Sequence, residues 1–187
     1  TMFGSDHYGL KPDLITIAKG LTSAYAPLSG SIVSDRMWKV LEQGTDENGP
    51  IGHGWTYSAH PICAAAGVAN LKLIDDLNLV SNAAEVGGYL NASMKEALGD
   101  HPNVGDIRGE GLRCAVEYVA DKADATPLDP AAKVGAAISA AMLERGVIAR
   151  AMPQGDITGF APPFCITRAE VDTVVAATAD AVKTVLG

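Results

Sequence analysis

The chain has 187 residues, of which 48% are hydrophobic and 19% are charged, and its formal net charge is −8. This composition is typical of a globular protein with a sizeable core and argues against a disordered chain. Acidic and basic residues are scattered along the sequence, so no basic stripe is available to neutralise phosphates. We therefore expect no nucleic-acid binding.

The sequence also argues against a membrane protein. No apolar run is long enough to span a bilayer and the chain does not open with a signal-peptide pattern, so we expect a cytoplasmic location. Cys63, Cys114 and Cys165 lie far apart and lack the spacing of metal ligands. We therefore expect them to be buried small hydrophobic residues of a reducing compartment, and neither disulfides nor zinc ligands.

A short apolar run over residues 13–18 ends in Lys19, and Gly20 follows directly. In an α/β protein, the carboxyl end of a buried strand is where ligands bind. A lysine at that point is partly desolvated, which leaves its neutral amine available as a nucleophile toward carbonyls. Most lysines are solvated surface charges, so other motifs must decide whether Lys19 is an exception.

The first part of the chain continues with a second predicted strand over residues 27–34. Because the link between the two strands is too short for a helical crossover, we expect them to pair antiparallel. Ser34 is placed to cap a helix. Residues 43–61 predict a long loop rich in Gly, Asn and Asp, and loops of this length are usually functional. A helix over residues 63–77 follows, and its small residues permit another backbone to approach closely.

The second part of the chain has a different texture, with helical and strand patterns in alternation. A helix from Leu79 carries an apolar stripe of Ala83, Val86, Leu90, Met94 and Ala97. We expect further helices over 129–142 and from the capping box 167–170 onward, and strands over 112–119, 147–152 and 157–160. Residues 1–76 thus look like a piece of a larger α/β sheet, and residues 77–187 like a small α+β domain.

Three segments together resemble the class III aminotransferases, which are pyridoxal-phosphate (PLP) enzymes of fold type I. Residues 13–20 are similar to the family's signature around its Schiff-base lysine, and residues 54–61 to its phosphate-binding loop. Residues 150–156 and 161–164 resemble the carboxylate-binding segment of the ω-amino-acid:pyruvate subgroup. The segments occur in the family's order and cover the whole chain.

The resemblance implies that residues 1–76 are the C-terminal part of the large PLP-transferase domain and that 77–187 are the small C-terminal α+β domain. Family members are considerably longer, so it also implies that this chain is the C-terminal half of an enzyme. The phosphate cup, the ring-stacking aromatic residue and the aspartate paired to the pyridine nitrogen then belong to an N-terminal half. We expect a homodimer or higher assembly with shared active sites, and no activity from the isolated chain.

The resemblance assigns roles to three residues of the cofactor site. Lys19 matches the lysine that forms the Schiff base with PLP. Thr56 matches a threonine that reaches the cofactor phosphate of the neighbouring subunit, and the backbone at Trp55 is a second candidate donor to that phosphate. The alternative for Thr56 is a turn residue that bonds within its own loop. Trp55 and Tyr57 either line the active-site entrance or pack in the core.

Arg150 lies on a predicted apolar strand, where a guanidinium is costly without a partner. Its planar fork suits a carboxylate, and the resemblance implies an arginine that binds the substrate carboxylate and swings aside for uncharged amines. The alternative is a structural salt bridge. We interpret Arg108, in an apparent glycine-rich turn over 106–111, as structural, and assign no chemistry to His53 or His60.

The predicted function is PLP-dependent transamination between an amine or ω-amino-acid donor and pyruvate or another keto acid. One alternative is another PLP reaction on the same scaffold, such as decarboxylation, racemisation or aminomutation. A second alternative, from a different class, is an inactive scaffold or assembly fragment. The donor is not specified by the sequence, because its pocket would be built largely by the other half.

Overall fold

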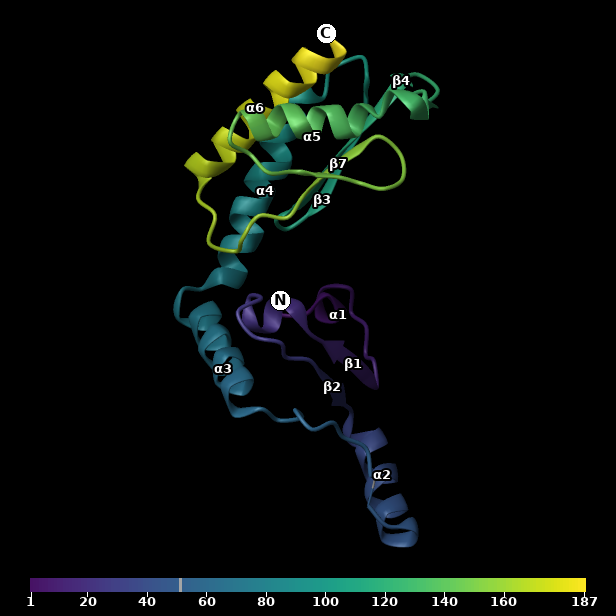
Figure 1. Ribbon diagram of the computed structural model, residues 1–187, viewed down its shortest axis with the longest axis vertical. Coiled ribbons are helices and arrows are strands. Elements are labelled where there is room, and N and C mark those ends of the chain that lie inside the picture. The colour runs from purple at the N-terminus through teal and green to yellow at the C-terminus, as the bar shows by residue number, and fades with distance from the viewer. Residues whose placement is uncertain (51) are drawn as a thin grey trace. The chain divides into compact units, whose positions relative to one another are not determined.

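The computed structural model describes residues 1–50 and 52–187, so Ile51 of the predicted loop lies outside the described residues. The chain forms two compact units, Thr1–Val80 and Ser81–Gly187 (Figure 1). Among the described residues, every helix is too short or too polar to cross a membrane.

The first unit is built around a two-stranded antiparallel ribbon, which confirms the predicted antiparallel pairing. Strand β1 (Leu14–Ile17) pairs with β2 (Gly30–Val33), with Ile17 opposite Gly30. The short 3₁₀ helix η1 (Lys19–Thr22) follows β1 almost directly. The remaining elements of this unit are α1 (Gly4–His7), α2 (Asp35–Asn48) and α3 (Pro61–Asp76).

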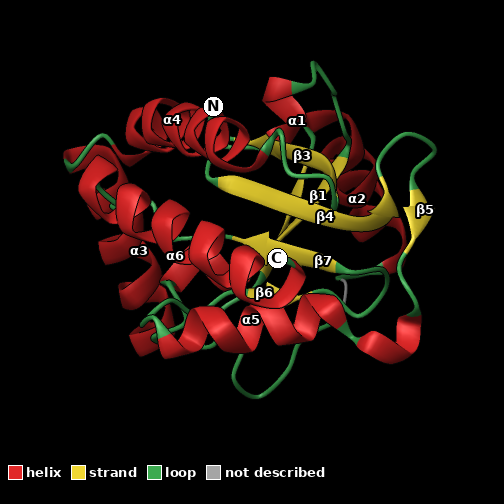
Figure 2. Cartoon of the chain, turned by 90° about the horizontal axis from the view of Figure 1, so that it is seen from above, coloured by secondary structure: helices red, strands yellow, loops and turns green. Residues whose placement is uncertain are grey.

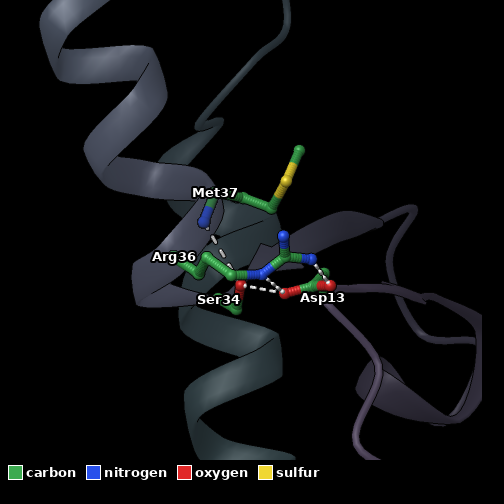
Figure 3. A network of polar contacts seen from close by, with 4 residues as sticks. All are labelled: Asp13, Ser34, Arg36 and Met37. Carbon is green, nitrogen blue, oxygen red and sulfur yellow. Dashed lines mark hydrogen bonds and ion pairs between the residues drawn. The ribbon is translucent and has the colours of Figure 1, made fainter.

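A polar network joins the start of β1 to the start of α2 (Figure 3). The Asp13 carboxylate accepts hydrogen bonds from Ser34 Oγ at 2.7 Å and from Arg36 Nε at 3.1 Å, and it pairs with the same guanidinium. The Arg36 guanidinium therefore lowers the pKa of Asp13. Ser34 is the predicted N-cap, and its Oγ accepts from the amide of Met37. Asp13 is thus a structural residue that fixes the entry to α2.

The predicted loop over residues 43–61 is wrong in its first part, because α2 continues to Asn48. Local side-chain bonds sustain this polar end: Gln43 donates to Glu47 at 2.8 Å, and Thr45 donates to the carbonyl of Leu41 at 2.9 Å. The helix ends at Gly49, whose φ of 86° is readily accessible only to glycine. The Gly, Asn and Asp content of this segment predicts a loop, but the i,i+4 side-chain contacts stabilise a helix.

The first unit buries few side chains, since only Thr22, Gly67 and Ile74 are buried among its described residues. Trp55 and Tyr57 are 76% and 79% exposed, so neither packs into a core of this chain. Large exposed apolar side chains of this kind commonly mark surfaces that other protein segments cover.

The second unit is an antiparallel sheet with helices on one face. Strands β3 (Val104–Glu110), β4 (Arg113–Asp121), β7 (Ile157–Phe160) and β6 (Arg150–Ala151) lie side by side in that order, and the short β5 (Thr126–Pro127) pairs with β4 (Figure 2). The helices are α4 (Leu79–Leu98), η2 (Pro130–Ala132), α5 (Val134–Glu144) and α6 (Arg168–Leu186).

The core of the second unit lies between the sheet and these helices. The strand predicted over 112–119 is confirmed as β4, and Leu112, Cys114, Val116 and Tyr118 are all buried. The predicted capping box of α6 is also confirmed, with the Thr167 and Glu170 side chains each bonded to the other's backbone amide. On α4, Leu98 is buried instead of the predicted Ala97, which is exposed.

Three predicted elements of this unit differ in the structure. Arg108 lies on β3 and not in a turn. Gly109 of the apparent turn is a residue of β3, and it must be glycine because an added Cβ would lie 2.1 Å from the Asn91 Oδ1 atom of α4. The predicted helix from Asp129 is interrupted at Lys133, whose φ is 49°. The strand predicted over 147–152 is reduced to the two residues of β6 at the sheet edge.

We predict that Cys114 makes the second unit sensitive to alkaline pH. Burial raises the pKa of its thiol from 9.0 to about 11. The unfolded chain therefore ionises first, and stability present below pH 9 is lost as the pH rises through 11, with a slope of up to about 1.4 kcal/mol per pH unit. Urea unfolding measured between pH 8 and 11 should show that the free energy of unfolding falls less steeply with pH in Cys114→Ala than in the unmodified chain. The expectation of three buried cysteines is wrong for Cys165, which is exposed and therefore serves as the matched control. Equal slopes for Cys114→Ala and Cys165→Ala would contradict the prediction.

Candidate functional site

Lys19 sits at an abrupt change of backbone direction where β1 ends. Ala18 is extended, and Lys19 then adopts a φ of 53° as the first residue of η1. Ser23 and Ala24 also have positive φ values. Such conformations cost non-glycine residues roughly 1–3 kcal/mol and cluster at functional sites. The turn therefore holds Lys19 in an orientation that a relaxed strand end does not produce.

The Lys19 side chain is exposed within this chain, so the expected partial desolvation is not supplied by the described residues. Its amine also forms no hydrogen bond or ion pair within residues 1–50 and 52–187. Lys72, by comparison, is paired with Asp76 at 2.7 Å. Lys19 thus presents an uncommitted amine.

Helix α3 holds the η1 turn in place from one side. A Cβ at Gly67 would lie 2.8 Å from Leu28 Cδ2 and 3.9 Å from the Leu21 carbonyl oxygen, which shows how closely the two segments approach. One turn further along α3, Asn70 Nδ2 donates to the carbonyls of Gly20 at 2.9 Å and Leu21 at 3.2 Å. Its Oδ1 atom accepts from Ser23 Oγ at 2.6 Å. The predicted close approach to α3 is confirmed.

Asn70 is absent from the site residues that the sequence predicts. Its only sequence signal is a polar side chain three residues after Gly67, on the same small-residue face of α3. It bonds to both sides of the strained turn, and it is therefore the residue that most directly supports the position of Lys19.

An open hollow of about 790 Å³ lies beside Lys19 in the first unit. This volume is in the range of small-molecule sites. The Nδ1 atom of His60 is buried and has no hydrogen-bond partner among the described residues. The hollow is lined, among others, by Lys19, Thr22, Ser29, Trp55, Tyr57 and His60.

The loop before α3 brings Trp55 to this hollow but not Thr56. The Trp55 amide donates to Ser58 Oγ at 2.9 Å, so this donor is already engaged in a turn. The Thr56 hydroxyl forms no hydrogen bond among the described residues, and Ser58 is the residue that bonds within its own loop. The turn-residue alternative for Thr56 therefore lacks the bond that it requires.

Arg150 begins β6 at the edge of the second unit's sheet, where it pairs with Gly159. Its guanidinium has no ion-pair partner in the part of the chain that the structure describes, so a structural salt bridge finds no acid there. Arg108 contrasts with it, since it pairs with Asp106 at 2.9 Å and Glu117 at 2.5 Å. These ion pairs raise the pKa of Arg108 and support the structural role that the sequence predicts.

Comparison with known protein families identifies the scaffold that carries these residues. The model of the family described as aminotransferase class-III matches residues 1–182. The chain belongs to the class-III aminotransferases. Members of this family depend on PLP.

Curated class-III relatives extend the match over nearly the whole chain. A diaminobutyrate–2-oxoglutarate transaminase of Halomonas elongata is 62% identical over 183 residues, which are 98% of this chain and 39% of that protein. A mitochondrial gamma aminobutyrate transaminase 1 of Solanum lycopersicum is 35% identical over 175 residues, or 94% of this chain and 33% of that protein. The chain thus spans well under half the length of these relatives.

Solved transaminase structures share the same fold. A structure from the directed evolution of transaminases by ancestral reconstruction superposes with a TM-score of 0.96 at 64% identity, over 99% of this chain and 40% of its own. An (S)-enantioselective omega-transaminase from Thermomicrobium roseum superposes with a TM-score of 0.92 at 41% identity, and the match covers 100% of this chain and 40% of that chain. The resemblance to class III aminotransferases and the fold-type I α/β class are confirmed.

The residues around Lys19 fit the family's cofactor. The hollow is large enough for a small molecule, and it presents an uncommitted amine together with the unpaired Nδ1 atom of His60. The first turn of α3 begins at Pro61 without a side-chain cap, which leaves backbone N–H groups for an anion such as a phosphate.

We predict that Asn70→Ala loosens the Lys19 turn. The change removes three hydrogen bonds and leaves two carbonyls of η1 without this partner, which should cost about 1–3 kcal/mol locally. Hydrogen exchange of the Leu21 and Ser23 amides, which bond to Ala18 and Gly20, should accelerate. Lys72→Ala, on the same helix but paired only with Asp76, is the matched control. Equal exchange in the two variants would contradict a clamp by Asn70.

Proposed function

We propose that this chain is part of a PLP-dependent aminotransferase that moves an amino group from an amine or ω-amino acid to a keto acid. The observation that carries the proposal is Lys19, an uncommitted amine held at positive φ at the end of β1 and facing a hollow of cofactor size. The names of the relatives support the reaction class, and one of them includes 2-oxoglutarate as acceptor. Pyruvate or 2-oxoglutarate is the acceptor that we propose.

Lys19 supplies the covalent and proton-transfer chemistry of this chain. When bound, PLP supplies an aldehyde that condenses with amines and a ring that withdraws electrons from the attached carbon. With the cofactor bound, the Lys19 amine would be the group that holds its aldehyde, and the same Nζ atom would accept and return a proton of the substrate. The hydrogen bonds from Asn70 fix the backbone that follows Lys19, and the Lys19 side chain lines the hollow.

The remaining groups of the site come from elsewhere in the assembly under this proposal. We assign Thr56 to the cofactor phosphate of a second subunit, which agrees with its exposed position and unbonded hydroxyl. The exposed Trp55 and Tyr57 side chains are covered in a homodimer or higher assembly. An N-terminal half, which the length of the relatives supports, supplies the groups around the ring.

We predict that Lys19→Ala abolishes amino transfer in the holoenzyme. The loss should reach at least the roughly 10²- to 10⁴-fold range of a lost acid–base group. The measurement is keto-acid-dependent conversion of donor, in which the amino acid product must form in step with donor loss. Lys11→Ala, an exposed lysine of the same unit, is the control and should retain activity. Donor loss without the matching amino acid would indicate a different PLP reaction.

We predict that Arg150→Ala affects substrates according to their charge. A charge-assisted bond to a carboxylate is worth about 1.5–3 kcal/mol, so kcat/KM for ω-amino acids should fall roughly 10- to 100-fold. Simple amines, which have no carboxylate, should change little in the donor half-reaction. Stopped-flow measurement of that half-reaction separates the two classes, and equal losses would favour a structural role for Arg150.

A further inference from the structure

The turn between β3 and β4 bounds an open hollow in the second unit. The hollow has a volume of about 980 Å³ and lies on the face of the sheet opposite the one that buries Cys114 and Val116. Glu110 and Arg113 line it from the two ends of the turn, and Arg150 lines it from β6. Because β7 separates β4 from β6, the turn and Arg150 lie on different sides of the hollow.

The turn is tight, and its conformation depends on a glycine. Glu110 and Arg113 are opposite each other in the register, so only Gly111 and Leu112 connect the two strands. Gly111 has a φ of 54°, which suits the first central position of a two-residue hairpin turn, where glycine is preferred. Leu112 is buried and anchors the tip of the turn in the core. The contacts of this tip therefore decide where Glu110 and Arg113 lie.

Helix α4 packs against the tip with no side chain between the two backbones. A Cβ at Gly87 would lie 2.2 Å from the carbonyl carbon of Gly111 and 2.6 Å from the backbone nitrogen of Leu112. The Asn91 side chain makes a second close approach, one helical turn further along, to the backbone at Gly109. Both approaches require glycine, so the turn and the helix fit together in one arrangement.

Asn91 fastens the turn to α4 through its side-chain amide. Its Nδ2 atom donates to the carbonyl of Gly87 in its own helix at 2.9 Å and to that of Gly111 in the turn at 3.0 Å. The carbonyl oxygen of Arg113 lies 3.5 Å from the same nitrogen. The Oδ1 atom is buried and has no hydrogen-bond partner among the described residues. Because a buried acceptor without a partner is unfavourable, the contribution of Asn91 to this contact is its donor.

We propose that Asn91 is a positioning residue for the substrate-carboxylate site around Arg150. By holding the β3–β4 turn against α4, it fixes the charged side chains of Glu110 and Arg113 on the side of the hollow away from β6. A ligand whose carboxylate is bound by Arg150 occupies a hollow that these side chains bound, so its fit depends on where the turn lies. The binding of the carboxylate by Arg150 rests on the proposed function. Asn91 acts through the turn and not by contact with the ligand.

A spectroscopic test asks whether the amide donor holds the turn. Asn91→Asp keeps the shape of the side chain but replaces the donor with a carboxylate, which the surrounding carbonyls repel. In mildly alkaline buffer, the backbone NMR signals of Gly111 and Leu112 in the full chain should shift and broaden in this variant. They should return toward their unmodified positions as the pH falls, because a protonated carboxyl again offers a donor and burial raises its pKa. Signals that do not change in alkaline buffer, or that do not respond to pH, would overturn the role of the donor.

A binding test connects the turn to the Arg150 site. Butyrate, a simple carboxylate, is titrated into the full chain while the side-chain NMR signals of Arg150 are followed, and Asn91→Ala should weaken its binding about tenfold. Asn103→Ala is the matched control, because Asn103 Nδ2 donates to the carbonyls of Val119 at 2.9 Å and Ala120 at 3.3 Å, at the far end of β4 and outside the hollow. Equal butyrate affinities in the two variants, or a titration that leaves Arg150 unperturbed, would sink the inference even if the enzyme transaminates.

The kinetic test uses the holoenzyme. Asn91→Ala should raise KM for ω-amino-acid donors about tenfold and change kcat less than about twofold, because the turn shapes binding and not the reacting atoms. Simple amines, which have no carboxylate, should change less than about twofold, and Asn103→Ala should behave as the unmodified enzyme. Matching losses for both classes of donor would contradict the positioning role. A butyrate effect that persists in a protein without transaminase activity would contradict only the proposed function.

Discussion

The candidate active site depends on the packing of η1 against α3. The Lys19 turn carries positive φ values at three non-glycine residues, a conformation that an isolated segment would leave. Two features of α3 offset that cost: the missing side chain of Gly67 admits the turn, and Asn70 bonds to both of its sides. The β1–β2 ribbon then fixes the direction from which the chain enters the turn, and the Asp13 network anchors the start of that ribbon.

The two faces of the sheet in the second unit carry different kinds of side chain. One face of β4 and β7 packs under the helices and buries Cys114, Val116 and Phe160. The other face carries Arg108, Arg113, Arg150 and Glu110 around the small residues Ala115 and Gly159. Because adjacent positions on a strand alternate between the faces, substitutions on the open face need not disturb the core.

Local patterns in the sequence predict the elements whose causes are local. The antiparallel ribbon, the Ser34 cap, the capping box of α6 and the alternation on β4 all follow from neighbouring residues. The hydrogen bonds of Asn70 and the strand order β3-β4-β7-β6 do not, because they depend on packing and register between distant segments. A glycine in the sequence does not always indicate a turn. Gly109 lies within β3, where its missing side chain allows Asn91 to approach closely. The roles of Lys19 and Arg150 follow from the sequence only through the resemblance of their motifs to a family, because a lysine or an arginine alone does not indicate a function.

The most direct measurement is the site of cofactor attachment in the PLP-loaded protein. Borohydride reduction fixes the cofactor to the amine that holds it, and peptide mass analysis then locates the modification. A single reduced adduct on Lys19, with Lys11 and Lys39 of the same unit unmodified, is the result that the clamped turn predicts. An adduct on another lysine, or labelling spread evenly over the exposed lysines, would show that the turn at Lys19 does not build the cofactor site.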